Sequence, residues 1–249
     1  MKGKLTVLLV GALAIWLLPV SGACAATVTI GSPLTSTFEN LPAGDDGTQA
    51  MVVGPNLSSP VDGTVVNWRT QNFFGNLRVR ILTIGSGNAA TATASSPTIP
   101  LAGGTVDSPV SLPIRKGQFV GFDNTSGSDR ADVVQDSTTY VSAFWSILPD
   151  NGSPQPAGDG ANLEFAYNAT VRYCLVPNVV GKEVGKAKQA LADAGCSLGK
   201  VTKKKAKKGK GKKKGPKVVR SQSAAAGTSL ADQAPVSVVV KNKKHKKKK

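Results

Sequence analysis

Histidine is nearly absent from this chain of 249 residues, and its one copy, His245, stands inside a lysine-rich C-terminal segment. Without histidine a folded domain has no Ser-His-Asp triad, no Cys-His pair and no histidine-ligated metal. Long apolar runs are also lacking after residue 20, so we expect no transmembrane span in the mature chain. We therefore expect neither an enzyme nor a bound cofactor or metal.

The first 25 residues have the composition of a secretory signal peptide. Lys2 and Lys4 give a positive start, residues 5–20 are almost entirely apolar, and small residues follow. Ala23-Cys24-Ala25 fits the A-x-A pattern of a cleavage site, so we predict that residues 1–25 are removed and that the protein is secreted. An uncleaved membrane anchor and a lipid anchor on Cys24 are the alternatives.

Acidic residues are few, 15 against 31 basic ones, and the imbalance is confined to one part of the chain. Residues 26–173 contain seven basic and twelve acidic side chains, whereas residues 174–249 contain twenty-two basic and three acidic ones. A step this sharp marks a domain boundary near residue 173. We therefore predict one domain at 26–173 and a second, strongly basic one after it.

Helical periodicity is missing from residues 26–173, where apolar and polar residues alternate with period two in short segments. In the clearest segment, Leu163, Phe165 and Tyr167 alternate with their neighbours. Clusters of Gly, Pro, Asn, Asp and Ser separate the segments, as turns require. Many short strands with such turns predict an antiparallel β-sandwich or jelly roll. The alternating segments are residues 64–69, 77–82, 118–122, 140–145 and 162–173.

The side chains of this first domain leave an alternative function open. Its aromatic residues, including Trp68, Trp145 and the pair Phe73-Phe74, are expected mainly in the core, although an exposed subset would form a sugar-stacking platform. A glycosidase would need two carboxylates about 5–10 Å apart in a cleft. The acidic turns at 45–47 and 123–129 offer oxygen ligands without the spacing of a defined Ca²⁺ loop.

A small α+β domain is predicted at residues 174–241. Residues 176–181 form an extended segment, and Gly195 stands where the C′ glycine of a helix belongs. The apolar stripe of a helix over about residues 182–194 consists of Val184, Ala187, Leu191 and Ala194. Strands are expected at residues 198–202, 217–222 and 235–241. One helix would then cover a three-stranded sheet.

Several short motifs recur in order along residues 175–241. They are Val176-Pro177-Asn178-Val179-Val180-Gly181, Ala187, Ala190-Leu191, Ala194-Gly195, Gly199-Lys200-Val201, Ser221-Gln222, Ala226-Gly227-Thr228 and Val236-Ser237-Val238-Val239-Val240. In this order and spacing they resemble a PASTA domain. The chain departs from the family's pattern at Ala224, where Pro is usual, and at residues 233–235, where a Gly usually precedes the last strand.

The family resemblance implies a location and a ligand. PASTA domains occur in the extracellular parts of bacterial Ser/Thr kinases and penicillin-binding proteins, and the first domain resembles a sandwich of exported actinobacterial proteins. The resemblance therefore implies an extracellular or wall-associated protein. It also implies contact with peptidoglycan fragments, and the alternative is a domain that acts as a spacer.

Cysteine is scarce, and only Cys174 and Cys196 remain if cleavage removes Cys24. Two cysteines in an exported protein suggest one disulfide. A length estimate agrees: the extended chain from Cys174 to Gly181 covers about 23 Å, and the helix returns about 20 Å. We therefore predict a structural Cys174–Cys196 disulfide.

Two lysine runs dominate the basic region, one in the loop at residues 203–217 and one in the tail at 242–249. Such blocks repel themselves and are expected to stay disordered until they meet an anion. Anionic wall polymers and phospholipid headgroups are the expected partners, with salt-sensitive affinity. The alternative is a solvated loop and tail with no specific partner. The candidate polyanion-binding residues are Lys203, Lys204, Lys205, Lys207, Lys208, Lys210, Lys212, Lys213 and Lys214.

These observations favour a non-catalytic, secreted protein of the cell envelope, attached to peptidoglycan or anionic wall polymers through its second domain and its lysines. A carbohydrate-binding module or glycosidase in the sandwich is the alternative. A second alternative is polyanion or nucleic-acid binding by the basic region. Specific nucleic-acid recognition is not expected, because no aromatic residues for base stacking stand among the lysines. Nothing in the sequence indicates an oligomeric state.

Overall fold

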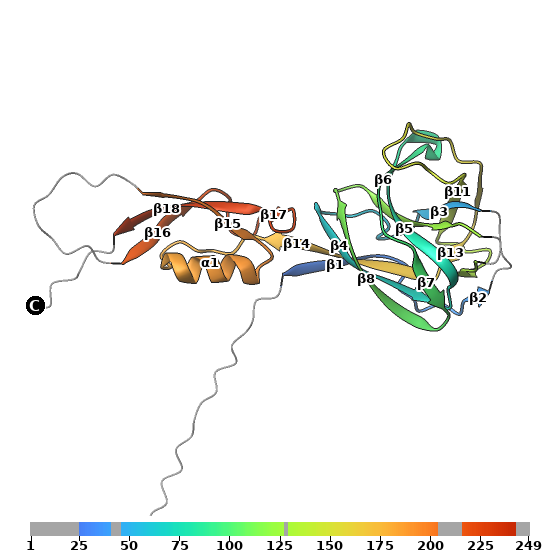
Figure 1. Cartoon of the computed structure of the whole chain (residues 1–249), viewed down its shortest axis with the longest axis horizontal. Coiled ribbons are helices and arrows are strands. Elements are labelled where there is room, and N and C mark those ends of the chain that lie inside the picture. The colour runs from blue at the N-terminus through green and yellow to red at the C-terminus, as the bar shows by residue number, and fades with distance from the viewer. Residues whose placement is uncertain (1–24, 41–45, 127–128, 204–215, 243–249) are drawn as a thin grey trace, which may run out of the picture.

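The computed structural model describes residues 25–40, 46–126, 129–203 and 216–242, which form two bodies lying end to end (Figure 1). The first body is built of antiparallel sheets, and the second of a small sheet with one helix. The predicted mainly β fold class is therefore confirmed. In these described residues no helix is long and apolar enough to cross a membrane. The predicted signal peptide lies outside them, apart from Ala25.

Two main sheets form the first body. One has the order β1-β14-β4-β8 and the other the order β12-β11-β3-β9-β5-β6, with β7 on β5. A short sheet, β13-β10-β2, lies beside them. The first sheet consists of β1 (Ala26–Gly31), β14 (Tyr167–Leu175), β4 (Gly63–Gln71) and β8 (Thr105–Ile114). The other strands are β2 (Glu39–Asn40), β3 (Gly47–Val53), β5 (Phe74–Ile84), β6 (Ala90–Ser95), β7 (Ile99–Ala102), β9 (Phe119–Asn124), β10 (Asp132–Val134), β11 (Val141–Trp145), β12 (Asp159–Ala161) and β13 (Glu164–Phe165).

A single apolar core lies between the two main sheets, so this body is a sandwich. Trp68 and Tyr167 enter the core from the first sheet, and Phe122 enters it from the second. These three rings contact one another with centroids 5.6 to 6.3 Å apart. The alternation expected over residues 162–173 holds only in part. Tyr167, Ala169 and Val171 are buried between half-buried neighbours, but Glu164 and Ala166 are buried as well as Phe165.

The outer face of the second sheet departs from simple alternation. In β5 Leu77, Val79 and Ile81 face the core between the sheets, but Arg80 and Leu82 on the opposite face are buried as well. A second apolar cluster covers that face, made of Ala50, Leu82, Ala90, Ala92, Ala143, Trp145 and Leu148. Arg80 is therefore enclosed although it stands at a position that the pattern assigns to solvent.

The second body consists of one helix and the sheet β15-β18-β16. The helix α1 (Val184–Asp193) buries Ala187 and Leu191, in agreement with the predicted stripe. After the helix, Gly195 has φ +73° and occupies the C′ position of a Schellman motif. In this motif the Gly195 N–H binds the Ala192 carbonyl, and the Cys196 N–H binds the Leu191 carbonyl. The strands are β15 (Ser197–Lys203), β16 (Lys217–Gln222), β17 (Ser229–Leu230) and β18 (Pro235–Asn242).

One strand joins the two bodies. β14 pairs with β1 and β4 in the sandwich and then with β17 in the second body, so it runs through the predicted boundary at residue 173. Within β14, Arg172 donates hydrogen bonds to both carboxylate oxygens of Asp232 at 2.8 to 3.1 Å. A Cβ on Gly195 would lie 2.8 Å from the Tyr173 carbonyl oxygen, so only glycine lets the helix end approach β14 this closely. The joint is thus fixed by strand pairing, a charge pair and close packing.

Candidate functional site

The basic strand ends of the second body lie at one edge of its sheet. β15 and β18 are parallel, so both end at the same edge, and β16 is antiparallel to β18 and begins there. Lys203 pairs with Val240, Lys217 with Asn242, and Val218 with Lys241. The three exposed lysines Lys203, Lys217 and Lys241 therefore lie together, and we call this group the distal lysine cluster. Figure 1 places these strand ends away from the sandwich.

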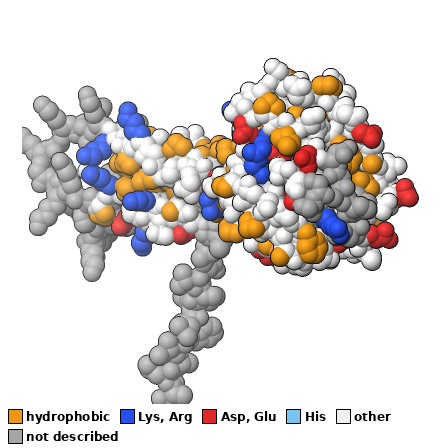
Figure 2. Space-filling view, turned by 45° about the vertical axis from the view of Figure 1, so that its right-hand side comes forward, with side chains coloured by type: hydrophobic (Ala, Val, Ile, Leu, Met, Phe, Trp, Pro, Cys, Tyr) orange, Lys and Arg blue, Asp and Glu red, His pale blue; other side chains and the backbone are white. Residues whose placement is uncertain are grey.

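The charge of the described residues follows the long axis of the molecule. In residues 174–203 and 216–242 eight side chains are basic and three are acidic. Of the acidic ones, Asp232 is already bound by Arg172 at the joint. Figure 2 shows Lys and Arg side chains toward the end of this body, whereas most Asp and Glu side chains on the visible face lie on the sandwich. The second body therefore attracts anions most strongly at its free end.

Both lysine runs join the described chain at the distal lysine cluster. The first run continues from Lys203 and the described chain resumes at Pro216, while the second follows Asn242. Of the nine candidate polyanion-binding residues, only Lys203 is described. The candidates outside the described residues are Lys204, Lys205, Lys207, Lys208, Lys210, Lys212, Lys213 and Lys214.

The motif residues mostly hold the second body together. Gln222 accepts a hydrogen bond from the Val179 N–H at 3.0 Å and donates to the carbonyls of Pro177 and Ala224 at 3.1 and 2.8 Å. The Gln222 side chain thus holds the opening segment, residues 176–181, against β16. The Ser237 hydroxyl oxygen accepts a hydrogen bond from the Lys200 backbone N–H at 3.1 Å. This bond lies next to Gly199, where the pairing register between β15 and β18 shifts. The Ser-Gln and Gly-Lys-Val motifs therefore have a structural role that the sequence alone did not reveal.

The opening segment also presents an apolar side chain to solvent. Val180 is 49% exposed, and its N–H binds the side-chain oxygen of Asn178 at 3.1 Å. Val179, its neighbour, is buried in the core of the same body. An exposed valine on a segment fixed by Gln222 offers a small apolar contact alongside β16, where the Gly181 N–H binds the Val219 carbonyl.

A disulfide joins the two cysteines singled out in the sequence. Cys174 stands near the end of β14 and Cys196 follows the Schellman turn of α1, with their Cα atoms 4.8 Å apart. Both are buried in the core of the second body. The bond ties the helix end to the strand that enters from the sandwich, which is consistent with an oxidising compartment.

The sandwich offers little of the sugar-stacking platform that its aromatic residues suggested. Trp68, Trp145 and Phe73 are buried, and only Phe74 of the adjacent pair is exposed. The acidic turn at 123–129 is occupied: Asp123 binds Arg78 and Arg80, and Asp129 accepts the N–H groups of Asn76 and Thr125. In the turn at 45–47, Asp45 lies outside the described residues and Asp46 is exposed. The described residues contain no group of three His, Cys, Asp or Glu side chains placed to hold a metal.

One opening in the sandwich is lined by two carboxylates. Asp46 and Asp159 line it together with Gln49 and Phe144, and its volume is about 500 Å³. Both aspartates are exposed, and Phe144 is half-buried. The general acid of a glycosidase is usually held in an apolar environment that keeps it protonated. If the sandwich is a carbohydrate-binding module or a glycosidase, this opening is the candidate site.

Comparison with known proteins identifies the second body only. Residues 175–242 match the PASTA domain, close to the range expected from the motifs. Neither the curated proteins nor the solved structures give a match to this chain. PASTA domains are extracytoplasmic and are generally associated with the binding of peptidoglycan and β-lactams. The helix, the mixed sheet and the pinned opening segment of residues 175–242 are therefore those of a PASTA domain.

Proposed function

We propose that this chain is an exported, non-catalytic protein of the cell envelope. Its PASTA domain and lysines would attach it to peptidoglycan or to anionic wall polymers, and the sandwich would stand away from the point of attachment. The observation that carries this proposal is the position of the distal lysine cluster, at the end of the PASTA domain opposite the joint with the sandwich.

Charge and fold have separate parts in this proposal. Long-range attraction to phosphate or carboxylate groups of the wall would come from the lysines and would weaken as salt shortens the screening length. Contact with a peptidoglycan fragment would come from the folded surface along β16, where Val180 is exposed on the segment that Gln222 holds. The proposal includes no chemical step, since Asp46 and Asp159, the pair in the acidic opening, are both exposed.

A pull-down on purified peptidoglycan, with and without its anionic polymers, tests this proposal. The whole chain is compared with Lys203→Gln/Lys217→Gln, which weakens the distal lysine cluster, and with Lys186→Gln/Lys188→Gln, which removes the same charge from helix α1. We expect the first variant to bind more weakly at low salt and the second to bind nearly as well as the parent. Equal loss in both would mean that net charge alone matters.

Salt separates specific recognition from simple attraction. At roughly 0.5 M salt the screening length falls to a few ångströms, so binding by lysines alone should be lost. Binding to polymer-stripped peptidoglycan that persists there supports recognition by the PASTA fold. The nucleic-acid alternative is tested in the same way with duplex DNA, and tighter binding to DNA than to either wall preparation would favour it.

A further inference from the structure

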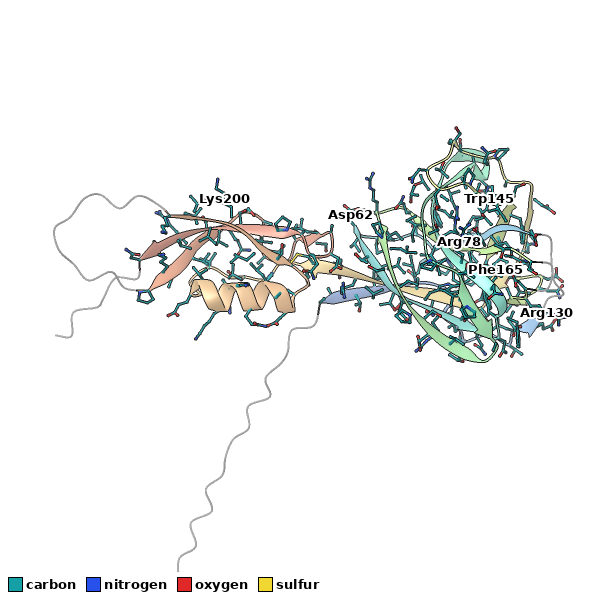
Figure 3. The ribbon with its side chains drawn as sticks, in the orientation of Figure 1. Asp62, Arg78, Arg130, Trp145, Phe165 and Lys200 are labelled. Carbon is teal, nitrogen blue, oxygen red and sulfur yellow. A yellow bond between two sulfur atoms is a disulfide. The ribbon has the colours of Figure 1, made fainter. Side chains whose placement is uncertain are left out.

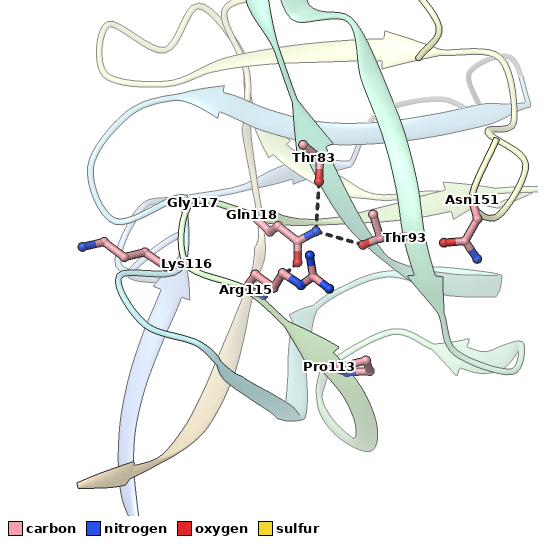
Figure 4. Close-up of a pocket in the computed structure, with 8 residues that line it drawn as sticks. All are labelled: Thr83, Thr93, Pro113, Arg115, Lys116, Gly117, Gln118 and Asn151. Atoms are coloured by element: carbon pink, nitrogen blue, oxygen red, sulfur yellow. Dashed lines mark hydrogen bonds between the residues drawn. The ribbon is translucent and has the colours of Figure 1, made fainter. Parts of the chain in front are cut away.

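A second opening in the sandwich has a lining opposite in charge to the acidic one. It has a volume of about 590 Å³, within the range of small-molecule sites. Figure 4 shows that four segments meet there: β5, β6, the end of β8 with the turn to β9, and the loop after β11. The lining residues are Thr83, Thr93, Pro113, Arg115, Lys116, Gly117, Gln118 and Asn151. We call this opening the basic pocket.

Gln118 organises the polar wall of the basic pocket, although only 8% of it is exposed. Its side-chain oxygen accepts the Arg115 backbone N–H at 2.8 Å. A backbone N–H can only donate, so the amide nitrogen must face the other way, toward Thr83 and Thr93 at 2.9 and 3.0 Å. Both threonine oxygens therefore act as acceptors from Gln118.

This arrangement leaves one hydroxyl hydrogen free for a ligand. Thr93 donates its hydrogen to the Ile81 carbonyl at 3.2 Å. Among the described residues no acceptor meets the hydroxyl hydrogen of Thr83, whose side chain is exposed. The Thr83 hydroxyl can therefore donate a hydrogen bond to a ligand, while its oxygen accepts one from the buried Gln118 amide.

The turn that carries the cations is held rigid. The Gln118 N–H binds the Arg115 carbonyl at 3.0 Å, and Gly117 between them has φ +85°, as a type II turn requires. Two more bonds fix the turn: the Gly117 N–H binds the Ser59 carbonyl and the Lys116 N–H binds Asp62, both at 2.8 Å. A ligand would therefore meet a preformed turn and pay little ordering entropy.

The cations at this pocket stand out against their domain. The side chains of Arg115 and Lys116 form no ion pair within the described residues, and no carboxylate lines the pocket. The rest of the sandwich has an excess of acidic residues. The carboxylate of Asp62 accepts the Lys116 N–H and is not among the lining residues. A basic site in an acidic domain favours an anion that also uses hydroxyl and amide partners.

We propose that the basic pocket binds an acidic saccharide, a sugar unit that carries a carboxylate or a phosphate group. Arg115 would hold the anionic group, and Thr83 and Asn151 would hydrogen-bond the sugar hydroxyls. The Lys116 side chain extends away from Thr83 and Asn151 in Figure 4, so it would add positive charge at the rim and no direct contact. The acidic opening at Asp46 and Asp159 would repel the same ligand. This site lies on the sandwich, so it does not depend on wall binding by the PASTA domain.

The test is an NMR titration of the ¹⁵N-labelled chain, because a site-resolved signal separates the basic pocket from the lysine runs. The side-chain amides of Gln118 and Asn151 are followed while glucuronic acid, glucose 6-phosphate or neutral glucose is added. The pocket variant is Arg115→Gln/Lys116→Gln. The control variant is Arg130→Gln/Lys200→Gln, which removes the same charge at two exposed positions that lie far from Asp62 and its turn in Figure 3.

We expect at least one of the two acids to shift these amides, with glucose binding at least tenfold more weakly. The pocket variant should lower the affinity for that acid at least tenfold and the control variant should leave it unchanged. A response to glucuronic acid alone assigns a carboxylated sugar, and one to glucose 6-phosphate alone a phosphorylated sugar. The proposal is wrong if neither acid shifts the amides, if glucose binds equally well, or if both variants behave like the parent.

Discussion

Reduction of the Cys174–Cys196 disulfide should destabilise the PASTA domain selectively. The bond closes a loop with a sequence separation of 22 residues, which corresponds to about 3 kcal/mol in the chain-entropy model. For a domain of this size, 1 kcal/mol changes the melting temperature by about 4–8 °C, so we expect a decrease of about 12–24 °C. The effect should be large because a small domain buries little apolar surface to compensate.

The two domains can be followed separately in the same sample. All tyrosine, phenylalanine and tryptophan residues precede residue 174, and Trp68 and Trp145 are buried in the sandwich. Tryptophan fluorescence therefore reports on the sandwich, and circular dichroism at the helical wavelength reports on α1, the α-helix of the described residues. Thermal scans with and without dithiothreitol should show the dichroism transition moving down while the fluorescence transition stays close to its original temperature.

A Cys174→Ala/Cys196→Ala variant provides the control. It should melt like the reduced parent or somewhat lower, since two buried sulfurs are also removed, and dithiothreitol should not change its scan. A dichroism transition that moves by less than about 3 °C on reduction would refute the reasoning, because even the lower bound of the expected change is several times larger.

Three further predictions concern single side chains. Asp123→Asn should destabilise the sandwich by about 3–5 kcal/mol in urea denaturation, since it removes the main counter-charge of Arg80, which is 1% exposed. Gln222→Ala should cost the PASTA domain about 1–3 kcal/mol by dichroism, because the Val179 N–H and the Pro177 carbonyl lose their partner. Hydrogen bonds from Arg69 and Asn67 lower the pKa of the Asp107 carboxyl, so its stabilisation is present above about pH 4 and lost as the pH falls through the lowered pKa. Asp107→Asn should therefore flatten the acid limb of the sandwich's stability profile, and an unchanged limb would contradict this assignment.

The helical pattern and the strand positions of the second domain were predicted well from the sequence. The stripe of α1 and the glycine after it were visible because helix packing and the Schellman turn depend on residues close in sequence. The prediction for β16, residues 217–222, agrees with Lys217–Gln222. These elements are specified by period and turn chemistry, which a single sequence displays directly.

Features that combine distant segments were not predictable in this way. Arg80 occupies an outward position in β5, yet the cluster around Trp145 and Leu148 covers it, and Asp123 comes from another strand. The basic pocket likewise joins four segments, and no spacing in the sequence relates Thr83 to Asn151. Ser221-Gln222 was visible as a motif, but its hydrogen bonds to the opening segment depend on how β16 lies beside that segment.

The pairing of β15 with β18 decides which end of the molecule carries the charge. Because the two strands are parallel, the loop after Lys203 and the tail after Asn242 leave the sheet at the same edge, away from the joint. An antiparallel pairing would have directed the tail back toward the acidic sandwich, where its lysines would meet carboxylates of the same chain. β14 and the Arg172–Asp232 pair then hold the sandwich at the opposite end. Attraction of the lysines to an anionic surface would therefore also orient the molecule, with the basic pocket on the domain that stays outside.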